Sequence, residues 1–293
     1  MFLLLAATLL LVTGLGAWLA SDRMERVAQI YDEATIYETA AGPQQAIVRG
    51  EGSPVLVLHG QFGGCDRGMW LARFVGMDDT MEVIAPSRPG YLGTPLDGRI
   101  SAEAQVEALA ALLDTLERSK VAMLVEDTAT DVALTFAEKF PERVSNLAIV
   151  YGNFTPKNQR ALQLAYDYRD NWKAKFLAPL TQIVAKMAPA SWPEINATRG
   201  FPIDLRLPGM IADGERLSQT CDLPKPSVPA LIVLNSKQRE QQGNDFDNFL
   251  SNHPLPPNVI ILPDVDFYSP EWIDTAKAIR EFLSGSAETP EQP

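Results

Sequence analysis

Short apolar segments alternate with helix-like segments along most of this chain, and this rhythm restricts the fold more than any other feature. The first clear example is Pro54 to Leu58, a continuous apolar run typical of a strand buried on both faces of a sheet. Strands that alternate with helices are joined by right-handed crossovers in a parallel sheet. We therefore predict an α/β fold, with a mostly parallel sheet and helices on both faces. Further apolar runs lie at residues 82–85, 121–125, 146–150, 229–234 and 259–262.

Two of the predicted helices have a one-sided apolar pattern. Ser101 is a favourable N-cap residue, and the segment after it carries apolar residues at helical spacing. The last helix-like segment has the same pattern, and each apolar face is expected to pack on the sheet. The residues are Val106, Leu109, Leu113 and Leu116 in the first helix, and Ile273, Ala276, Ile279 and Leu283 in the last.

The alternation stops between residues 153 and 228, which predicts an insertion. An aromatic, helix-prone stretch from Tyr166 to Phe176 is followed there by several prolines. We predict that this insertion is a lid, which separates a first core part, residues 34–152, from a second part, residues 229–283. The last segment, residues 284–293, is rich in small residues and proline and is predicted to be disordered.

The N-terminal residues 2–20 contain no charged side chain. As a helix they would extend roughly 28 Å, close to the thickness of a bilayer's hydrocarbon core, so we predict a single-pass N-terminal transmembrane helix and a membrane localisation. A cleaved signal peptide is the alternative, but no basic residue precedes the apolar run. Residues 21–33 are predicted to form a charged stalk, and the arginines within it, set among acids, leave the side of the membrane open.

The charge of the chain excludes one class of partner. The formal net charge is −12, which repels nucleic acid phosphates, and no basic patch offsets it. We therefore expect no nucleic-acid partner. The only two cysteines, Cys65 and Cys221, have no metal-binding spacing, and two separate thiols are a simpler interpretation than a disulfide.

Three local patterns follow strands in a fixed order. The first strand ends in His59-Gly60, with Gly63-Gly64 shortly after, and the next ends in the loop from Ser87 to Pro95, SRPGYLGTP. The third pattern is a strand, turn and helix that closes at Pro141-Glu142-Arg143-Val144. Together these patterns resemble the α/β-hydrolase fold family, with its oxyanion loop, its arginine-glycine loop and its nucleophile turn. The resemblance covers residues 34–152 well and residues 229–283 by pattern alone.

The resemblance implies a nucleophile position, and an aspartate occupies it. Counting back from Pro141 places residues 125–129 on the five positions of the family's G-x-S-x-G turn, with Asp127 in place of the serine. Both glycines of the motif are absent. The resemblance assigns the oxyanion-loop-like positions to His59, Gly60, Gln61 and Thr128.

The rest of the catalytic triad is absent from its expected positions. Residues 235–240, where the family places its acid, contain no aspartate, and residues 263–269, where it places its histidine, contain no histidine. His59 lies in the oxyanion loop, where the family's histidine is structural, and His253 precedes the last strand at the opposite edge of the sheet. The resemblance is therefore to a member with a degenerate triad.

Asp127 has two interpretations. Dehalogenases and epoxide hydrolases of this family use an aspartate nucleophile, so Asp127 could act with Asp266 as an unorthodox base. Without a histidine base, it could be alkylated once and stay blocked, because general-base help is worth about a hundred- to ten-thousand-fold. The alternative is that Asp127 caps the following helix, as aspartate often does.

Further acids gather near the same predicted edge of the sheet. Glu126, Asp127, Asp264 and Asp266 could share protons, pair with Lys237 or hold a metal, but they lack the ligand spacing of a calcium loop. We predict no metal and no cofactor. Cys65 is expected to be a packed side chain, and Arg88 to fix its own loop.

The sequence thus favours a membrane-anchored α/β-hydrolase-fold protein without hydrolytic activity. It would act as an interaction subunit, a scaffold or a small-molecule binder. The expected partners are the membrane, through residues 2–20, a protein in a membrane complex, and a small apolar ligand under the lid. The alternative is an active hydrolase, of the ester, carbon–halogen or epoxide type, that uses Asp127.

Overall fold

The computed structural model describes residues 2–77, 81–170, 202–264 and 269–285. A single eight-stranded sheet forms its centre, in the order β1-β2-β4-β3-β5-β6-β7-β8. β1 and β2 are antiparallel to each other, β2 is antiparallel to β4, and the remaining pairs are parallel. The predicted mostly parallel sheet is therefore confirmed. The strands are β1 (Thr35–Thr39), β2 (Gly42–Arg49), β3 (Ser53–Leu58), β4 (Met81–Pro86), β5 (Val121–Glu126), β6 (Val144–Val150), β7 (Ala230–Asn235) and β8 (Asn258–Leu262).

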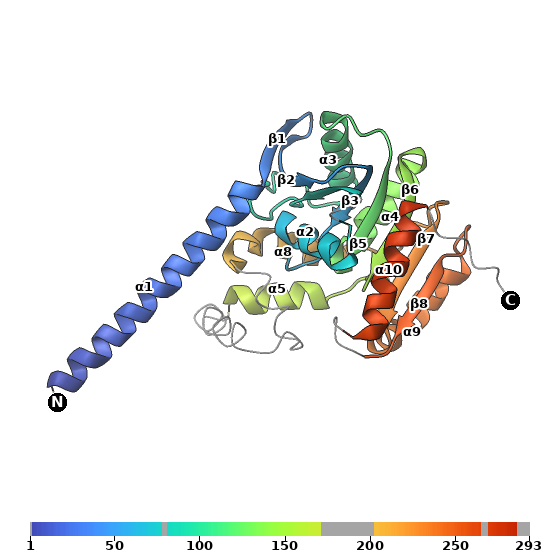
Figure 1. Ribbon diagram of the computed structural model, residues 1–293. Helices are drawn as coiled ribbons and strands as arrows, with labels where there is room; N and C mark the ends of the chain where they lie inside the picture. Colours follow the sequence, from blue (N-terminus) through green and yellow to red (C-terminus); the bar gives the residue numbers. More distant parts are fainter. Residues whose placement is uncertain (1, 78–80, 171–201, 265–268, 286–293) are drawn as a thin grey trace.

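Helices cover both faces of this sheet (Figure 1). One buried cluster joins the sheet to α3 (Ala102–Thr115), α4 (Thr130–Lys139) and α9 (Ser236–Ser251). A second cluster joins the other face to α2 (Cys65–Val75) and α10 (Pro270–Ser284). β5 is buried at every position because it lies in the middle of the sheet with helices on both sides.

The predicted helix faces are confirmed with one exception. Val106, Leu109 and Leu113 of α3 are buried as expected. On α10, Ile273 is 64% exposed, and Trp272 beside it is buried in its place. The larger aromatic ring fills the space against Phe74 of α2, so the buried face of α10 is rotated from the predicted one.

The predicted anchor and stalk form one continuous helix, α1 (Phe2–Glu33), which projects from the domain in Figure 1. Its last turns contact the domain: Ile30 is buried in the second cluster, and Arg23 forms an ion pair with Asp204 at 2.5 Å. A bilayer span needs about 20 predominantly apolar residues, and the charged residues from Asp22 onward belong to this same helix. In the described part of the chain, no helix combines the length and apolar character needed to cross a membrane. The predicted transmembrane helix over residues 2–20 and the membrane localisation are therefore wrong.

The predicted lid is described in part. α5 (Arg160–Asp170) pairs with α8 (Leu207–Gln219), and a short 3-10 helix, η3 (Ile203–Leu205), precedes α8. Residues 171–201, including part of the aromatic stretch, lie outside the described residues. So does most of the predicted disordered tail, although Ser284 belongs to α10. The division into core, lid and tail stays a prediction.

Candidate functional site

Asp127 lies at the turn that the register predicted, directly after β5. It begins a short 3-10 helix, η1 (Asp127–Ala129), which leads into α4. Its backbone has a φ of 50°, in the left-handed region that non-glycine residues adopt rarely and at some cost. Its side chain does not cap α4, whose N-cap residue is Ala129, so the capping interpretation is wrong. The strained turn places the carboxyl group at the carboxyl-terminal edge of the sheet.

The oxyanion-loop residues meet this carboxyl group. The backbone N–H groups of Gln61 and Thr128 lie close enough to the Asp127 carboxylate to lower its pKa. Gly60 passes so close that a Cβ atom there would lie 2.9 Å from the Asp127 Cβ and 3.3 Å from Oδ2. Only a glycine permits this approach. Three of the four predicted oxyanion-loop positions therefore surround Asp127.

Burial and nearby acids change the acidity of Asp127. Removal from water is the largest cause and raises its pKa, and the charge of Glu126 raises it further, to about 6. The two backbone N–H groups lower the pKa and offset part of this effect. The group is thus mostly ionised at neutral pH and becomes protonated in mildly acidic solution.

Glu126 has its own partner on α2. Arg67 donates from Nε to Glu126 Oε2 at 3.0 Å and from Nη2 to Oε1, and the guanidinium lies over the Trp70 ring at 4.1 Å. This bidentate pair holds Glu126 beside the elbow, as we call the turn of residues 126–129, and stabilises its ionised form. Glu126 is therefore a supporting residue rather than a free acid.

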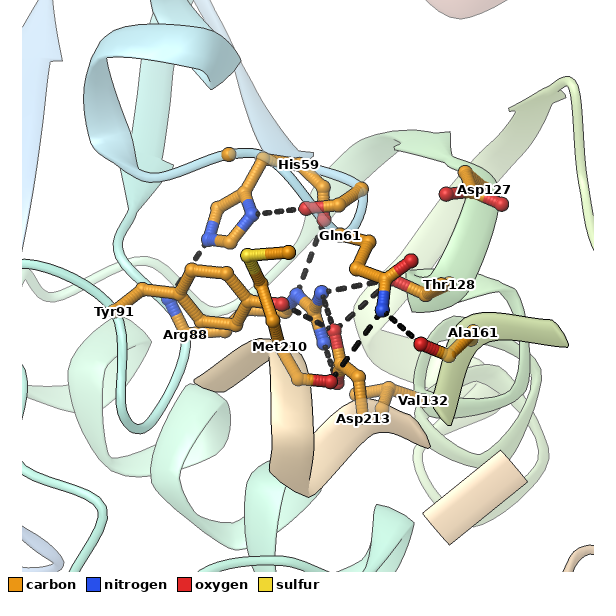
Figure 2. A network of polar contacts seen from close by, with 12 residues as sticks. His59, Gln61, Arg88, Tyr91, Asp127, Thr128, Val132, Ala161, Met210 and Asp213 are labelled. Atoms are coloured by element: carbon orange, nitrogen blue, oxygen red, sulfur yellow. Dashed lines mark hydrogen bonds and ion pairs between the residues drawn. The ribbon is translucent and has the colours of Figure 1, made fainter. Parts of the chain in front are cut away.

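A buried polar network ties the elbow to the lid (Figure 2). Asp213 of α8 accepts from Arg88 Nη1 at 2.7 Å, from Tyr91 Oη at 2.6 Å and from Thr128 Oγ1 at 3.0 Å. Arg216, one turn further along α8, donates to the Thr128 carbonyl at 2.8 Å and forms an ion pair with Asp131. Burial raises the pKa of Asp213, but the two arginines outweigh it and hold that pKa well below its usual range. Arg88 was predicted to fix its own loop, and its bonds to Asp213 show that it also holds α8.

The side chain of Gln61 makes a second link to the lid. Its Nε2 donates to the Ala161 carbonyl of α5 at 2.6 Å and to the Met210 carbonyl of α8 at 3.4 Å (Figure 2). Gln61 and Thr128, whose N–H groups lie beside the Asp127 carboxylate, are therefore both held by α5 or α8.

Both histidines are held by backbone groups away from Asp127. His59 is fully buried; its Nδ1 lies 2.8 Å from the Gly60 carbonyl and its Nε2 accepts from the Arg88 N–H at 3.0 Å. These partners select a neutral ring, and burial lowers its pKa well below the ordinary value. His253 precedes β8, at the opposite end of the strands, and its Nδ1 lies 2.6 Å from the Leu255 carbonyl. Neither ring is placed to act as a base for Asp127.

The remaining candidate residues have separate positions. Asn235, at the end of β7 where the family's acid was expected, caps α9 through a reciprocal bond with Gln238. Asp266 lies outside the described residues, so its proposed pairing with Asp127 is untested. Among residues that the structure describes, no three histidine, cysteine or acidic side chains are grouped as metal ligands.

The two cysteines are separate. Cys65 is buried, Cys221 is exposed and both are free. Burial raises the pKa of the Cys65 thiol to about 12, so it is an inert packed group.

Sequence reasoning missed Asp213 and Arg216. They lie in the insertion, where no motif points to them. Their spacing of three residues was a visible signal of a shared helix face, but it did not reveal that the face is buried against the elbow.

Comparisons with known proteins agree with this architecture. Residues 53–214 match the family model described as alpha/beta hydrolase fold. A 108-residue segment is 29% identical to the uncharacterized hydrolase YcgS of Bacillus subtilis and spans 37% of each chain. Among solved structures, an esterase from Exiguobacterium antarcticum has a TM-score of 0.66 at 17% identity, covering 85% of this chain and 99% of its own. An epoxide hydrolase from Vigna radiata has a TM-score of 0.64 at 18% identity, covering 86% and 98%. At these identities the structures are evidence for the fold alone.

Proposed function

Because this chain belongs to the alpha/beta hydrolase fold family, we propose that it uses the elbow and lid of that fold to bind a small molecule without turning it over. One observation carries this proposal: the elbow residue is Asp127, and neither histidine of the chain faces it. Hydrolysis through a covalent intermediate needs a base to activate water. Loss of that base costs about a hundred- to ten-thousand-fold in rate.

The state of the oxyanion hole supports the same conclusion for esters. The Asp127 carboxylate occupies the space beside the N–H groups of Gln61 and Thr128, which lower its pKa. An ester carbonyl would have to displace that carboxylate before it could use the same donors. Loss of even one such donor costs about 10²–10³ in rate, so ester hydrolysis has neither its nucleophile nor its stabilising site.

Turnover assays of the full chain test this proposal. We expect no catalysed hydrolysis of a short-chain p-nitrophenyl ester, an epoxide or a haloalkane, and the same background rate for Asp127→Asn. We also expect one of these uncleaved compounds to raise the melting temperature, because a ligand that binds only the folded state stabilises it. Multiple turnovers that disappear in Asp127→Asn would refute the proposal.

A second candidate function is a single covalent reaction at Asp127. The two neighbouring backbone N–H groups favour the ionised carboxylate, and its pKa of about 6 leaves it ionised at neutral pH. A carboxylate oxygen would attack the carbon of a haloalkane; a C–O bond forms, the carbon–halogen bond breaks, and halide leaves with the electron pair. The resulting ester would persist because no histidine activates water to cleave it.

Intact-mass spectrometry distinguishes these candidates. A single reaction predicts the mass of one alkyl group on the wild type, one equivalent of released halide, and no adduct on Asp127→Asn. Asp264→Asn is the matched control, since Asp264 is an exposed acid in the loop after β8. Halide release beyond one equivalent that is lost in Asp266→Asn would instead favour an active hydrolase with Asp266 as its base.

A further inference from the structure

The outer edge of β8 has the features of a pairing surface. β8 is the last strand of the sheet in the described part of the chain and pairs only with β7 there. An edge strand presents unpaired N–H and C=O groups, which proteins usually protect with charged side chains. Residues 254–263 contain no ionisable side chain, and Val259 and Ile261 are 38% and 43% exposed. The opposite edge strand, β1, carries a charged residue, Glu38.

We propose that this edge docks a second copy of the chain, with the two β8 strands antiparallel about a twofold axis. A twofold axis makes the same strand serve as both partners, so each contact between two different positions occurs twice. The two sheets would then join into one continuous sheet. This inference does not depend on the function proposed for Asp127.

The prolines around β8 select one register. Pro257 and Pro263 lie three residues before and three residues after Ile260. Proline has no N–H to donate to a ladder, so each one ends the pairing. A twofold axis through Ile260 is therefore the only position that pairs all five residues of Asn258–Leu262 with their copies and sets proline opposite proline at both ends.

Side-chain alternation supports the same register. With the axis through Ile260, Val259 lies opposite Ile261 of the second copy, and both project from the same face of the strand. Ile260 projects from the other face, where it packs against the cluster that includes Trp272. Each exposed residue thus meets a β-branched partner, which is a favourable cross-strand pair.

Charge also favours a copy of this chain at the edge. Most surfaces of a chain with net charge −12 would repel an identical surface. The segment from residue 254 to 263 brings no like charges together. A five-residue ladder would bury less surface than the roughly 800 Å² per partner that is typical of stable interfaces. The dimer should therefore be weak, and its population should depend on concentration.

Analytical ultracentrifugation of the full chain tests the proposal. We expect a reversible monomer–dimer equilibrium, and at least about a tenfold larger dissociation constant for Ile261→Lys, since it removes two apolar pairs per dimer. Ile36→Lys is the matched control, because Ile36 is 49% exposed on the opposite edge strand, β1. Both variants keep α1 unchanged, so any association through that helix is the same in both. A wild type that stays monomeric, or two variants with equal effects, overturns the proposal.

Disulfide formation tests the register. In a Cys221→Ser background, Ile260→Cys would set two thiols across the twofold axis at a Cα separation of about 4.5–5.5 Å, which a disulfide can bridge. We expect a covalent dimer under mild oxidation from I260C and none from Ile36→Cys in the same background. If I260C gives no dimer, or I36C gives one equally well, the register and the pairing are wrong.

Discussion

Replacement of Asp127 by asparagine should stabilise the protein at neutral pH. The pKa of Asp127 is raised from 3.8 to about 6, chiefly by burial and then by Glu126. The folded state therefore favours the protonated carboxyl group, and the ionised form costs folding free energy. Each pH unit between the two pKa values corresponds to 1.36 kcal/mol, so the cost at a pH above both values is roughly 3 kcal/mol.

The sign of the pH dependence follows from the raised pKa. This cost is absent well below pH 3.8, grows as the pH rises through the interval to about 6, and is constant above it. At about pH 4.5 it should have fallen to about 1 kcal/mol. Asp127 is only partly buried, and solvent screening reduces the gain expected from Asp127→Asn at about pH 7.5 to about 1–3 kcal/mol.

Urea unfolding at the two pH values measures this difference. Asp127→Asn should raise the unfolding free energy at about pH 7.5 and give a smaller gain at about pH 4.5. Asp222→Asn provides the control, because Asp222 is an 87%-exposed acid and should change stability by less than about 0.5 kcal/mol. An Asp127→Asn variant that is less stable than the wild type at about pH 7.5, or whose gain grows as the pH falls, would contradict the reasoning.

Three further substitutions test the structure around the elbow. Asp213→Asn leaves two buried arginines without their shared carboxylate and should lower the free energy of unfolding in urea by about 3–5 kcal/mol. Asp222→Asn is again the control, and a loss below about 1 kcal/mol for Asp213→Asn would mean that the network is not as described. Gly63→Ala would bring a Cβ within 2.3 Å of His59 Nδ1, so thermal unfolding should show a loss of about 1–3 kcal/mol, and a neutral result would place the loop elsewhere. Trp272→Phe removes the indole N–H that donates to Tyr151 Oη at 2.9 Å and should lower the free energy of unfolding in denaturant by about 1 kcal/mol. In the double variant, Tyr151→Phe should lower it little further, and full additivity of the two losses would argue against that bond.

The sheet and the elbow register follow from local sequence. Apolar runs such as Pro54 to Leu58 specify buried strands because the side-chain pattern of a strand does not depend on distant residues. The helix end at Pro141 counts back to Asp127 because turn and helix lengths are set along the chain. The position of the carboxylate could therefore be predicted, and so could the absence of a histidine from the loop after β8.

The sequence alone was misleading where a segment's surroundings decide its structure. The apolar residues 2–20 suggested a separate anchor, whereas one helix extends from them through the charged stalk to Ile30 in the core. Ile273 fitted the predicted apolar face of α10, but packing against Phe74 buried Trp272 instead. In both cases periodicity described a helix without stating what that helix would contact.

The sequence alone determined a mostly parallel sheet with an aspartate at the elbow, because strand burial and turn spacing are local properties. Only the tertiary structure decided what surrounds that aspartate. The Gln61 N–H reaches it from a loop far away in sequence, and Asp213 reaches Thr128 across 85 positions of the chain. Such contacts depend on where crossovers and the lid return the chain, and buried charges are acceptable there only because each finds its partner in three dimensions.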